Sequence, residues 1–350
     1  MLRVALVPGD GIGPDVIAQA TAVLQAVADS SGRELRAVGF PWGADHYLQT
    51  GETLPADALP MLQDGFDTIL LGALGDPRVP DNRHAADILL GLRFRLDLYV
   101  NCRPVRLFHE KLCPLKDVRR EDVDFVVFRE NTEGLYVMMG GTFKKDTADE
   151  VATEVDLNTR KGVERIVRHA FEYARRTRRG RLVMSDKSNV LVHGHGLWQR
   201  VFQAVAAEYA DVQATHMYVD NLALQLVRAP GQFQVIVTSN MFGDIVTDLA
   251  AALQGGLGMA ASGNIHPGRL SLFEPVHGSA PPLAGKNLAN PMGAILSAAL
   301  MLEHLGWTEE AGRIEQAVRW AVESDLTTPD IGGRMGTREV GEAIADRLRR

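Results

Sequence analysis

Residues 7–16, VPGDGIGPDV, follow the apolar opening MLRVAL and decide how the start of this chain folds. An apolar run, a glycine cluster and a helical pattern together predict a strand, a tight turn and a helix. The dinucleotide fingerprint Gly-x-Gly-x-x-Gly also lies between a strand and a helix. Gly9 and Gly11 fit it, but Pro14 occupies the third glycine's position and Gly13 comes one residue early. We therefore interpret the stretch as a strand-to-helix turn in which Pro14 starts the helix.

The rest of the chain alternates short β-rich runs with helical patterns. Residues 68–75, TILLGALG, read as a strand, and KGVERIVRHAFEYARRT at 161–177 is a helical pattern followed by the strand pattern RLVMSD. Strands that alternate with helices form parallel sheets covered on both faces, so the predicted fold class is α/β. A length of 350 residues suits two domains of ordinary size.

The composition excludes several classes of protein. A net charge of −7 gives no general attraction to nucleic acid, and the one basic run, residues 175–181, closes a helical segment. Cys102 and Cys113 have no Cys-x-x-Cys spacing, which argues against a disulfide framework or a zinc site. The longest apolar run, residues 293–302, is too short to span a membrane. We expect a cytoplasmic protein with no nucleic-acid or membrane partner.

Three arginines form the first candidate group. Arg93 and Arg103 are ten residues apart in GLRFRLDLYVNCRPV, and Arg129 follows in VVFRENTEGLY. A guanidinium binds a carboxylate through two parallel hydrogen bonds, so three of them suit a small di- or tricarboxylic acid. Each arginine taken singly is better explained as a surface or salt-bridging residue, and only the three together favour a carboxylate site.

Acidic side chains form a second candidate group. Asp244 and Asp248 share one face of a helix that we expect to begin near Phe242, and Asp220 ends the run HMYVD. The three carboxylates could bind Mg²⁺ or Mn²⁺, which prefer oxygen ligands. Helix capping and a solvated acidic face explain the same spacing.

Tyr136 and Lys187 are the candidate proton-transfer groups. A lysine near other cations and a divalent metal has its charged form disfavoured, so it can act as a general base or pass a proton to one. A tyrosine beside it could return the proton. Most tyrosine and lysine residues do neither, so this assignment needs further support. The ends of parallel strands are where such groups gather, and Arg129, Lys187, Asp220 and Asp244 all follow apolar runs.

Seven motifs, taken together, resemble one enzyme family over essentially the whole chain. The family is that of the metal-dependent decarboxylating dehydrogenases of 3-isopropylmalate, isocitrate, homoisocitrate and tartrate or D-malate. In chain order the motifs are VPGDGIGPDV, LRFRLDLYVNCRPV, FRENTEGLY, DKSNV, YVD, TSNMFGDIVTDLA and FEPVHGSAPPLAGKNLANP.

The resemblance implies roles for the candidate residues. Arg93, Arg103 and Arg129 would bind the malate carboxylates. The Mg²⁺ or Mn²⁺ ion would be bound by Asp220, Asp244 and Asp248. Tyr136 and Lys187 would transfer protons. The resemblance also implies a homodimer, possibly paired into a tetramer, in which Lys187 and Asp220 enter the active site of the partner subunit.

The resemblance further implies two α/β domains, each with a parallel or mixed sheet. Residues 1–98 and 255–350 would form the first, on the cofactor side, and residues 99–254 the second, with the metal ligands and the dimer interface. NAD would lie in a cleft built partly from HGSAP and the following ANP. The implied cofactor contacts are Ile12, His277, Gly278, Ser279, Ala280, Pro282, Leu283 and Asn290.

Substrate and nucleotide choice depend on a few positions. Leu89 and Leu90 precede Arg93 and resemble the isopropylmalate branch, which would place the enzyme in leucine biosynthesis; tartrate and D-malate enzymes also carry aliphatic residues here, and isocitrate or homoisocitrate remain alternatives. Ala86 stands where isopropylmalate enzymes carry a glutamate. Pro282 replaces an aspartate that binds the adenosine ribose, so NAD is favoured while NADP stays possible.

A non-catalytic regulatory subunit of the same fold is the alternative from another class. Such subunits tend to lose the tyrosine, the lysine or the metal aspartates. This chain keeps all of them, together with the three arginines, which favours an enzyme.

Overall fold

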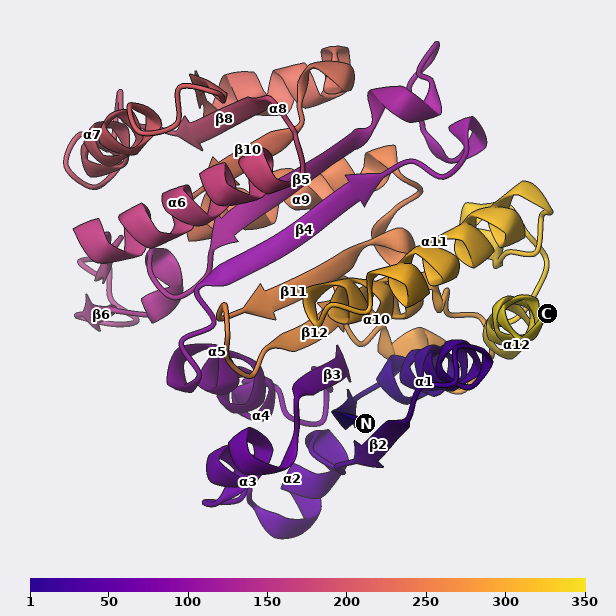
Figure 1. The fold of residues 1–350 in the computed structure, drawn as a ribbon. Helices are drawn as coiled ribbons and strands as arrows, with labels where there is room; N and C mark the ends of the chain where they lie inside the picture. Colours follow the sequence, from indigo (N-terminus) through magenta and orange to yellow (C-terminus); the bar gives the residue numbers. More distant parts are fainter. The chain divides into compact units, whose positions relative to one another are not determined.

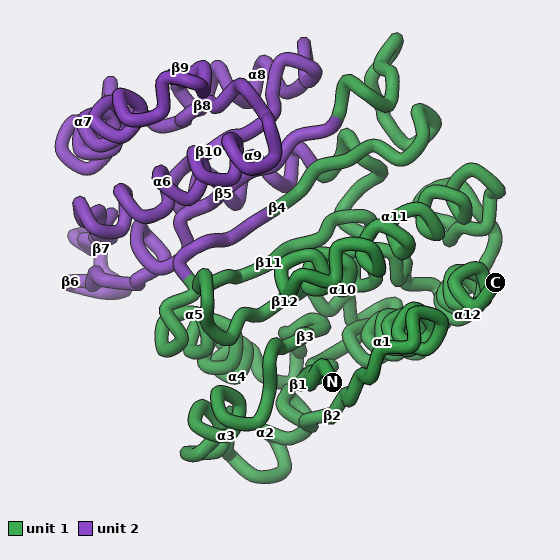
Figure 2. Tube along the Cα trace, in the orientation of Figure 1, with its two compact units in different colours: residues 1–98, 103–123, 251–350 green, residues 99–102, 124–250 purple.

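The computed structural model describes residues 1–350, which form two compact units (Figure 2). Unit 1 comprises residues 1–98, 103–123 and 251–350, and unit 2 comprises residues 99–102 and 124–250. Both units contain a sheet and helices, so the predicted α/β class is confirmed. The domain boundaries near residues 98 and 254 stay predictions.

The sheet of unit 1 has the strand order β2-β1-β3-β12-β11. Its pairings are parallel except that of β11 with β12, which is antiparallel, so the sheet is mixed. Every residue of β3 is buried, as expected for a parallel strand covered on both faces. The strands are β1 Leu2–Gly9, β2 Leu35–Gly39, β3 Thr68–Ala73, β11 Ala261–Ile265 and β12 Leu272–Pro275. Strand β4, Val100–Arg106, begins in unit 2 and ends in unit 1.

Four long helices of unit 1 pack against one another, α1 on α10 and α12, and α11 on α10 and α12 (Figure 1). Helix α10 is buried almost all round, which explains the apolar run 293–302 without a membrane. None of the helices combines the length and the apolar composition that a membrane span requires. The helices are α1 Gly13–Ser30, α2 Ala44–Thr50, α3 Ala58–Gly65, α4 Arg83–Ala85, α5 Gly91–Arg95, α10 Met292–His304, α11 Thr308–Glu323 and α12 Thr337–Arg349.

The glycine turn, residues 9–13, connects β1 to α1 as predicted, and Pro14 lies in the first turn of the helix. Gly11 has a φ of +58°, and a Cβ there would overlap the carbonyl oxygen of Ser279. Beside it, the backbone N–H of Ile12 donates to the same oxygen over 2.8 Å. The glycines therefore let the turn contact the segment HGSAP through backbone atoms alone.

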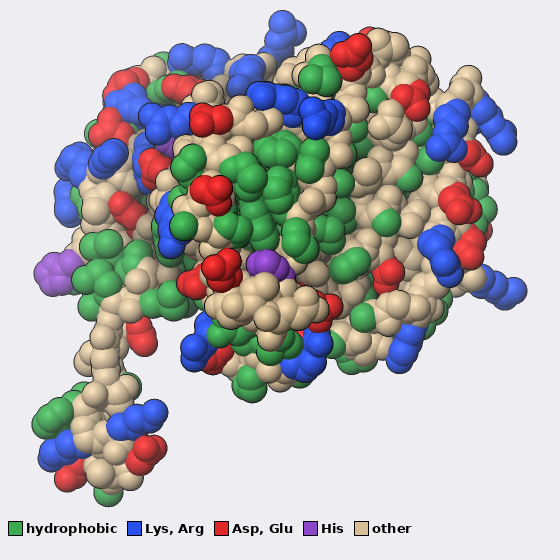
Figure 3. All heavy atoms as spheres, turned by 90° about the horizontal axis from the view of Figure 1, so that it is seen from below, with side chains coloured by type: hydrophobic (Ala, Val, Ile, Leu, Met, Phe, Trp, Pro, Cys, Tyr) green, Lys and Arg blue, Asp and Glu red, His purple; other side chains and the backbone are tan.

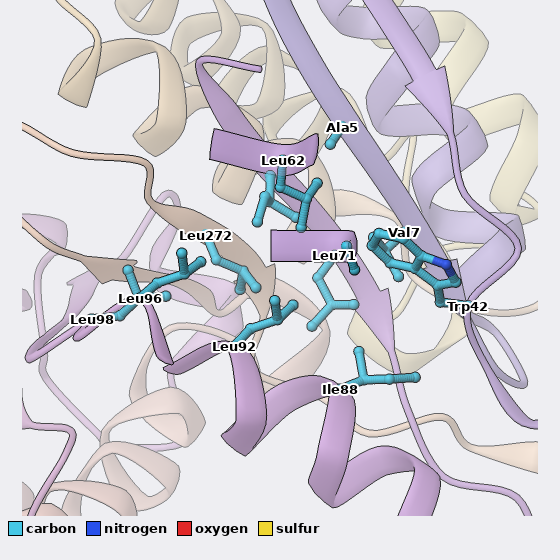
Figure 4. Close-up of a cluster of buried hydrophobic side chains, with 12 residues drawn as sticks. Ala5, Val7, Trp42, Leu62, Leu71, Ile88, Leu92, Leu96, Leu98 and Leu272 are labelled. Atoms are coloured by element: carbon cyan, nitrogen blue, oxygen red, sulfur yellow. The ribbon is translucent and has the colours of Figure 1, made fainter. Parts of the chain in front are cut away.

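A cluster of buried apolar side chains fills unit 1 between the sheet and the segment that precedes β4 (Figure 4). Ile88, Leu92 and Leu96 lie four residues apart and point to one side, toward Leu71 and Leu272. The other members of the cluster are Ala5, Val7, Trp42, Ala58, Leu62, Ile69 and Leu98.

The sheet of unit 2 contains β5, β10, β8 and β9 in that order, all parallel. Helix α6 packs on it through an apolar stripe, and Thr159 caps the helix by accepting from the N–H of Gly162 over 2.9 Å. The elements are β5 Asp124–Glu130, α6 Arg160–Arg176, β8 Arg181–Asp186, α7 Gly194–Ala206, β9 Gln213–Tyr218, α8 Val219–Arg228, β10 Val235–Thr238 and α9 Asn240–Leu253, whose last residues belong to unit 1.

A two-stranded antiparallel ribbon, β6 Gly140–Phe143 with β7 Val151–Glu154, also belongs to unit 2. All eight of its residues are exposed. Basic and acidic side chains are intermixed at the edges of the face in Figure 3, without a continuous basic patch. Arg175 and Arg179 of the basic run pair with Asp211 and Asp124.

We predict that Gly11→Ala lowers the free energy of unfolding by about 3 kcal/mol, because the new Cβ meets both a left-handed backbone and the Ser279 carbonyl. Gly32 has a φ of +65° but no atom within 4 Å of its would-be Cβ, so it is the matched control. Gly32→Ala should cost about 1 kcal/mol. Denaturant unfolding of both variants measures the difference, and equal losses would show that the close contact contributes nothing.

Candidate active site

The predicted polar residues of unit 2 lie at the carboxyl ends of its parallel strands. Arg129 is the second-last residue of β5, Lys187 follows β8 directly, and Asp220 comes two residues after β9. Asp244 lies in the second turn of α9, which begins at Asn240, two residues earlier than predicted. Parallel strands end at one edge of their sheet, so the fold brings these residues to that edge.

Arg129, Asp244 and Tyr136 form one hydrogen-bonded group. The Arg129 guanidinium, 1% exposed, donates from Nη1 to Oδ1 of Asp244, and the Tyr136 hydroxyl donates to Oδ2 of the same carboxylate over 2.5 Å. The guanidinium also lies over the Tyr136 ring, 4.8 Å from its centre. A cation, a carboxylate and a phenol are thus held in fixed contact.

Helix α9 approaches Arg129 closely for two reasons. Asn240 accepts from Nε of Arg129 over 2.9 Å and donates to the Glu133 carbonyl oxygen over 2.9 Å. Gly243 faces the aliphatic part of the arginine, where any Cβ would collide with its side-chain carbons. Asn240 and Gly243 therefore orient the guanidinium, although neither was a candidate from the sequence.

The Tyr136 phenol holds its proton strongly. Partial burial, reinforced by the hydrogen bond to Asp244, raises its pKa above the usual value near 10. The nearby Arg129 charge acts in the opposite direction and is the smaller effect. At neutral pH the group is a phenol, able to donate a proton.

Lys187 and Asp220 form a second group. Lys187 Nζ donates to Oδ1 of Asp220 over 2.5 Å, and this hydrogen bond lowers the pKa of the Asp220 carboxyl. The Asp220 side chain is 67% exposed, so it faces outward from its own chain. No group of three or more His, Cys, Asp or Glu side chains within one chain is placed to hold a metal ion. Asp220 therefore does not join Asp244 and Asp248 in the same chain.

A buried histidine holds the backbone at Lys187. His195, 2% exposed, accepts at Nδ1 from the Lys187 N–H over 3.0 Å, and its Nε2 lies 3.5 Å from Oδ2 of Asp156. The hydrogen bond from His195 lowers the pKa of the Asp156 carboxyl. Nothing in the sequence pattern singled out His195, because its partners are 8 and 39 residues away.

In unit 1, Arg93 and Arg103 are both 6% exposed. Arg93 donates from Nη2 to Oε1 of Glu274 over 2.9 Å, and the same oxygen accepts from Asn264 over 2.8 Å. The Nε of Arg93 is buried without a hydrogen-bond partner. A buried cationic donor without a partner is costly unless an anion binds there.

Leu89 and Leu90 lie in a π-helical turn, Ala86–Leu90, between α4 and α5. Both are partly buried, and Leu89 packs against the apolar cluster of Figure 4. A π turn inside a helix is rare and often occurs at functional sites. Ala86, which stands at the position of the family's glutamate, begins the turn.

The predicted cofactor segment is tied to the glycine turn through Ser279 and Ile12. Ala280 has a φ of +39°, and residues 281–283, which include Pro282 and Leu283, form a short 3₁₀ turn. Asn290, 6% exposed, donates to Asp330 over 3.1 Å and accepts from the N–H of Met292 over 3.0 Å. Gly278, by contrast, is exposed.

His277 has a defined protonation pattern. Its Nδ1 lies 3.0 Å from the Gly278 carbonyl oxygen, so Nδ1 carries the hydrogen, and burial lowers the pKa of the ring. The ring is therefore neutral at pH 7, with Nε2 as an acceptor that is buried and unpartnered. Such an atom suits a ligand that offers an N–H donor.

Comparison with known proteins assigns the family. The sequence pattern of isocitrate/isopropylmalate dehydrogenases matches residues 3–344. The chain belongs to this isocitrate/isopropylmalate dehydrogenase family. The 3-isopropylmalate dehydrogenases of Corynebacterium kroppenstedtii and Beutenbergia cavernae are 48% and 49% identical to it, covering 99% of this chain and 99% and 98% of theirs. The isocitrate dehydrogenase structure from Methylococcus capsulatus is 38% identical, with a TM-score of 0.91 and full coverage of both chains.

The resemblance found in the motifs is thereby confirmed, together with the dehydrogenase fold. This member of the isocitrate/isopropylmalate dehydrogenase family is an oxidoreductase, as the motifs predicted. Three orienting residues were missed in the sequence: Asn240, Glu274 and His195. Asn240 could have been found, because it lies four residues before Asp244 on one helix face. Glu274 and His195 are recognisable only once their partners are in contact.

We predict that Asp156 makes stability depend on pH in acid. A carboxyl whose pKa is lowered in the folded state stabilises that state above its unfolded pKa of about 3.9, and the effect is lost as pH falls through the folded pKa. The gap in unfolding free energy between wild type and Asp156→Asn should thus be largest above about pH 4 and shrink below it. Asp57→Asn, at an exposed position, is the control and should show no such trend. A gap that stays constant with pH would contradict the assignment.

Proposed function

We propose that the chain catalyses the oxidative decarboxylation of 3-isopropylmalate, with NAD as hydride acceptor and Mg²⁺ or Mn²⁺ as metal. The observation that carries the proposal is the group in which the buried Arg129 and the partly buried Tyr136 both bind the Asp244 carboxylate. That group combines an anion-binding cation, a hard oxygen ligand and a proton donor. The names of the relatives at 48–49% identity support the substrate.

The substrate carboxylates would bind to Arg93, Arg103 and Arg129. All three side chains are nearly fully buried, and the unpartnered Nε of Arg93 is a donor that a carboxylate would satisfy. Glu274 accepts from Nη2 of Arg93, and Asn240 accepts from Nε of Arg129. The arginines are thus oriented before the substrate binds, which reduces the entropy cost of binding.

The metal would be held by Asp244 and Asp248 of one chain and Asp220 of its partner. The donor set fits, since carboxylate oxygens are the ligands that Mg²⁺ and Mn²⁺ prefer. Asp220 is mostly exposed on a single chain, as a ligand donated to a second subunit has to be. When bound, the metal would acidify the substrate hydroxyl and stabilise the negative charge that develops as CO₂ leaves.

Proton transfer would use Lys187 and Tyr136. Lys187, held at its backbone by His195, would take the proton of the C2 hydroxyl as hydride passes to the nicotinamide. After loss of CO₂, the Tyr136 phenol would protonate the carbon that has lost it. With a pKa above the usual value near 10, the phenol carries its proton at neutral pH, as a proton donor has to.

The adenosine part of the cofactor would lie against the segment 277–290. The unpartnered Nε2 of His277 is an acceptor and fits the amino group of adenine. Ile12, Ser279 and Ala280 shape the backbone around it. Pro282 offers no carboxylate to the ribose, so NAD is proposed first and NADP second.

Substrate choice would depend on Leu89 and Leu90. Aliphatic side chains provide no hydrogen bond to a third carboxylate, and they suit an isopropyl group. D-malate and tartrate are the second candidates, because the same carboxylate-binding arginines would accept them.

The exposed apolar residues of unit 2 support a homodimer. Seven of them are more than half exposed, and such residues favour burial against another chain. They are Met138, Met139, Phe143, Val151, Val190, Val192 and Ile245. Val190 follows Lys187 by three residues, so a partner chain that covered Val190 would also lie near Lys187.

A substrate panel tests the proposed reaction. We predict the highest kcat/KM with 3-isopropylmalate among 3-isopropylmalate, D-malate, tartrate, isocitrate and homoisocitrate, each measured with NAD and with NADP by nicotinamide absorbance. Exhaustive chelation should abolish turnover and Mn²⁺ should restore it. A tenfold preference for isocitrate, about 1.4 kcal/mol in transition-state binding, would refute the substrate. Turnover of none of the acids would favour the regulatory-subunit alternative.

Mixing two inactive variants tests whether the active sites are shared. Arg103→Ala and Lys187→Ala homodimers should each be nearly inactive. If equal amounts are unfolded together and refolded, about half of the dimers are mixed, and each mixed dimer has one site with both groups intact. Activity should then return to about a quarter of wild type. No recovery, with refolded wild type as a normal control, would place both groups in one chain.

A further inference from the structure

Asp10, in the middle of the glycine turn, binds three separate segments of unit 1. Its Oδ1 accepts from the N–H of Ala44 over 2.6 Å, and its Oδ2 accepts from the N–H of Gly75 over 2.8 Å. His84 Nε2 lies 2.8 Å from the same Oδ2. Asp10 is 6% exposed and His84 is fully buried, so water does not compete for these bonds.

The backbone around Asp10 is shaped to allow these contacts. A Cβ at Gly43 would lie 2.7 Å from Oδ1 of Asp10, so only glycine lets the start of α2 approach the carboxylate. Gly75 has a φ of +124°, a conformation that other residues rarely adopt. Glycines therefore shape all three backbone segments that meet at the Asp10 carboxylate: the start of α2, the loop at Gly75 and the glycine turn itself.

His84 belongs to the helical segment that carries the proposed substrate residues. This segment runs through α4, the π turn and α5, from Arg83 to Arg95. Ile88 and Leu92 anchor its middle in the apolar cluster, and Arg93 anchors its end at Glu274 (Figure 4). His84 is the polar anchor at its start.

The π turn makes the start of this segment important. One extra residue in a turn rotates all later side chains relative to earlier ones. The directions of Leu89 and Leu90 therefore depend on where the segment begins as well as on where it ends. The apolar cluster cannot fix this by itself, because contacts between aliphatic side chains are not directional.

We propose that Asp10 and His84 are positioning residues for substrate selection. Their hydrogen bond holds the start of the segment so that Leu89 and Leu90 face the alkyl group of the substrate. The inference rests on the proposed function, since it concerns how the same site distinguishes an isopropyl-substituted malate from malate itself. It goes beyond that function by assigning selectivity to two buried residues that do not touch the substrate.

Two substitutions at position 84 separate the hydrogen bond from side-chain size. The amide nitrogen of glutamine occupies the place of Nε2, whereas that of asparagine falls short, at the place of Nδ1. We predict that His84→Gln keeps the ratio of kcat/KM for 3-isopropylmalate over D-malate within about twofold of wild type, while His84→Asn lowers it about tenfold. KM for NAD should stay unchanged in both.

Asp10→Asn provides the second test, because an amide has only one acceptor oxygen and cannot accept from Ala44 at one end and from Gly75 and His84 at the other. It should lower the ratio as His84→Asn does. Arg83→Ala is the matched control: its side chain is exposed and forms its ion pair with Asp81, and the ratio should not move. Thermal melting checks that each variant is folded. If either His84→Asn or Asp10→Asn fails to fold, the ratio measured for the other variant tests the inference.

The ratio of kcat/KM for 3-isopropylmalate over D-malate decides between the possible outcomes. Equal ratios in folded His84→Asn or Asp10→Asn and in wild type would overturn the inference, even if the melting temperature falls. Wild type that turns over neither acid would instead refute the proposed function. A fall in the ratio for Asn, with recovery for Gln, supports the positioning role, because a merely structural defect would lower the rates with both acids alike.

Discussion

Contact between backbone segments at the glycine turn is the constraint on which unit 1 depends. Gly11 has to lie against the Ser279 carbonyl for Ile12 to donate to it, and this sets the place of the segment that would bind adenosine. Asp10, one residue away, receives N–H groups from α2, from the loop after β3 and from His84. One five-residue turn thus relates the proposed cofactor segment to the proposed substrate segment. The dinucleotide fingerprint is incomplete here because the glycines allow contact with protein backbone in place of a pyrophosphate.

The buried guanidinium of Arg129 determines how strand β5 and helix α9 meet in unit 2. Arg129 is buried at the end of β5, and its guanidinium is held by Asn240 and Asp244 of α9. Burying a cation is favourable only when acceptors surround it, so the helix and the strand have to meet at this point. Gly243 makes that approach possible. The arrangement leaves Tyr136 protonated beside a carboxylate, which is the state in which a phenol can act as an acid.

The proposed activity requires the glycine turn of unit 1, the Arg129 group of unit 2 and a further pair, Lys187 and Asp220. One chain does not bring this pair to its own Asp244 and Asp248. Lys187 pairs with Asp220, whose side chain is mostly exposed, apart from Asp244 and Asp248. Val190, three residues after Lys187, and Phe143 on the ribbon are exposed apolar residues of unit 2. In the proposed homodimer, a second copy of the chain would cover them and would supply Lys187 and Asp220 to the site.

The sequence by itself determined the α/β class, the strand-to-helix turn at Pro14, the family, and most of the candidate residues, because periodicity and motif spacing are local properties of the chain. It also predicted the positions of Arg129, Lys187, Asp220 and Asp244 at strand ends. Only the tertiary structure identified Glu274, His195 and the Asp10–His84 contact, since these partners come together from distant parts of the chain. The π turn at Leu89 and Leu90 is likewise a tertiary result. Its residues show ordinary helical spacing, and the contacts at both ends of the segment, which lie far away in sequence, decide where its side chains point.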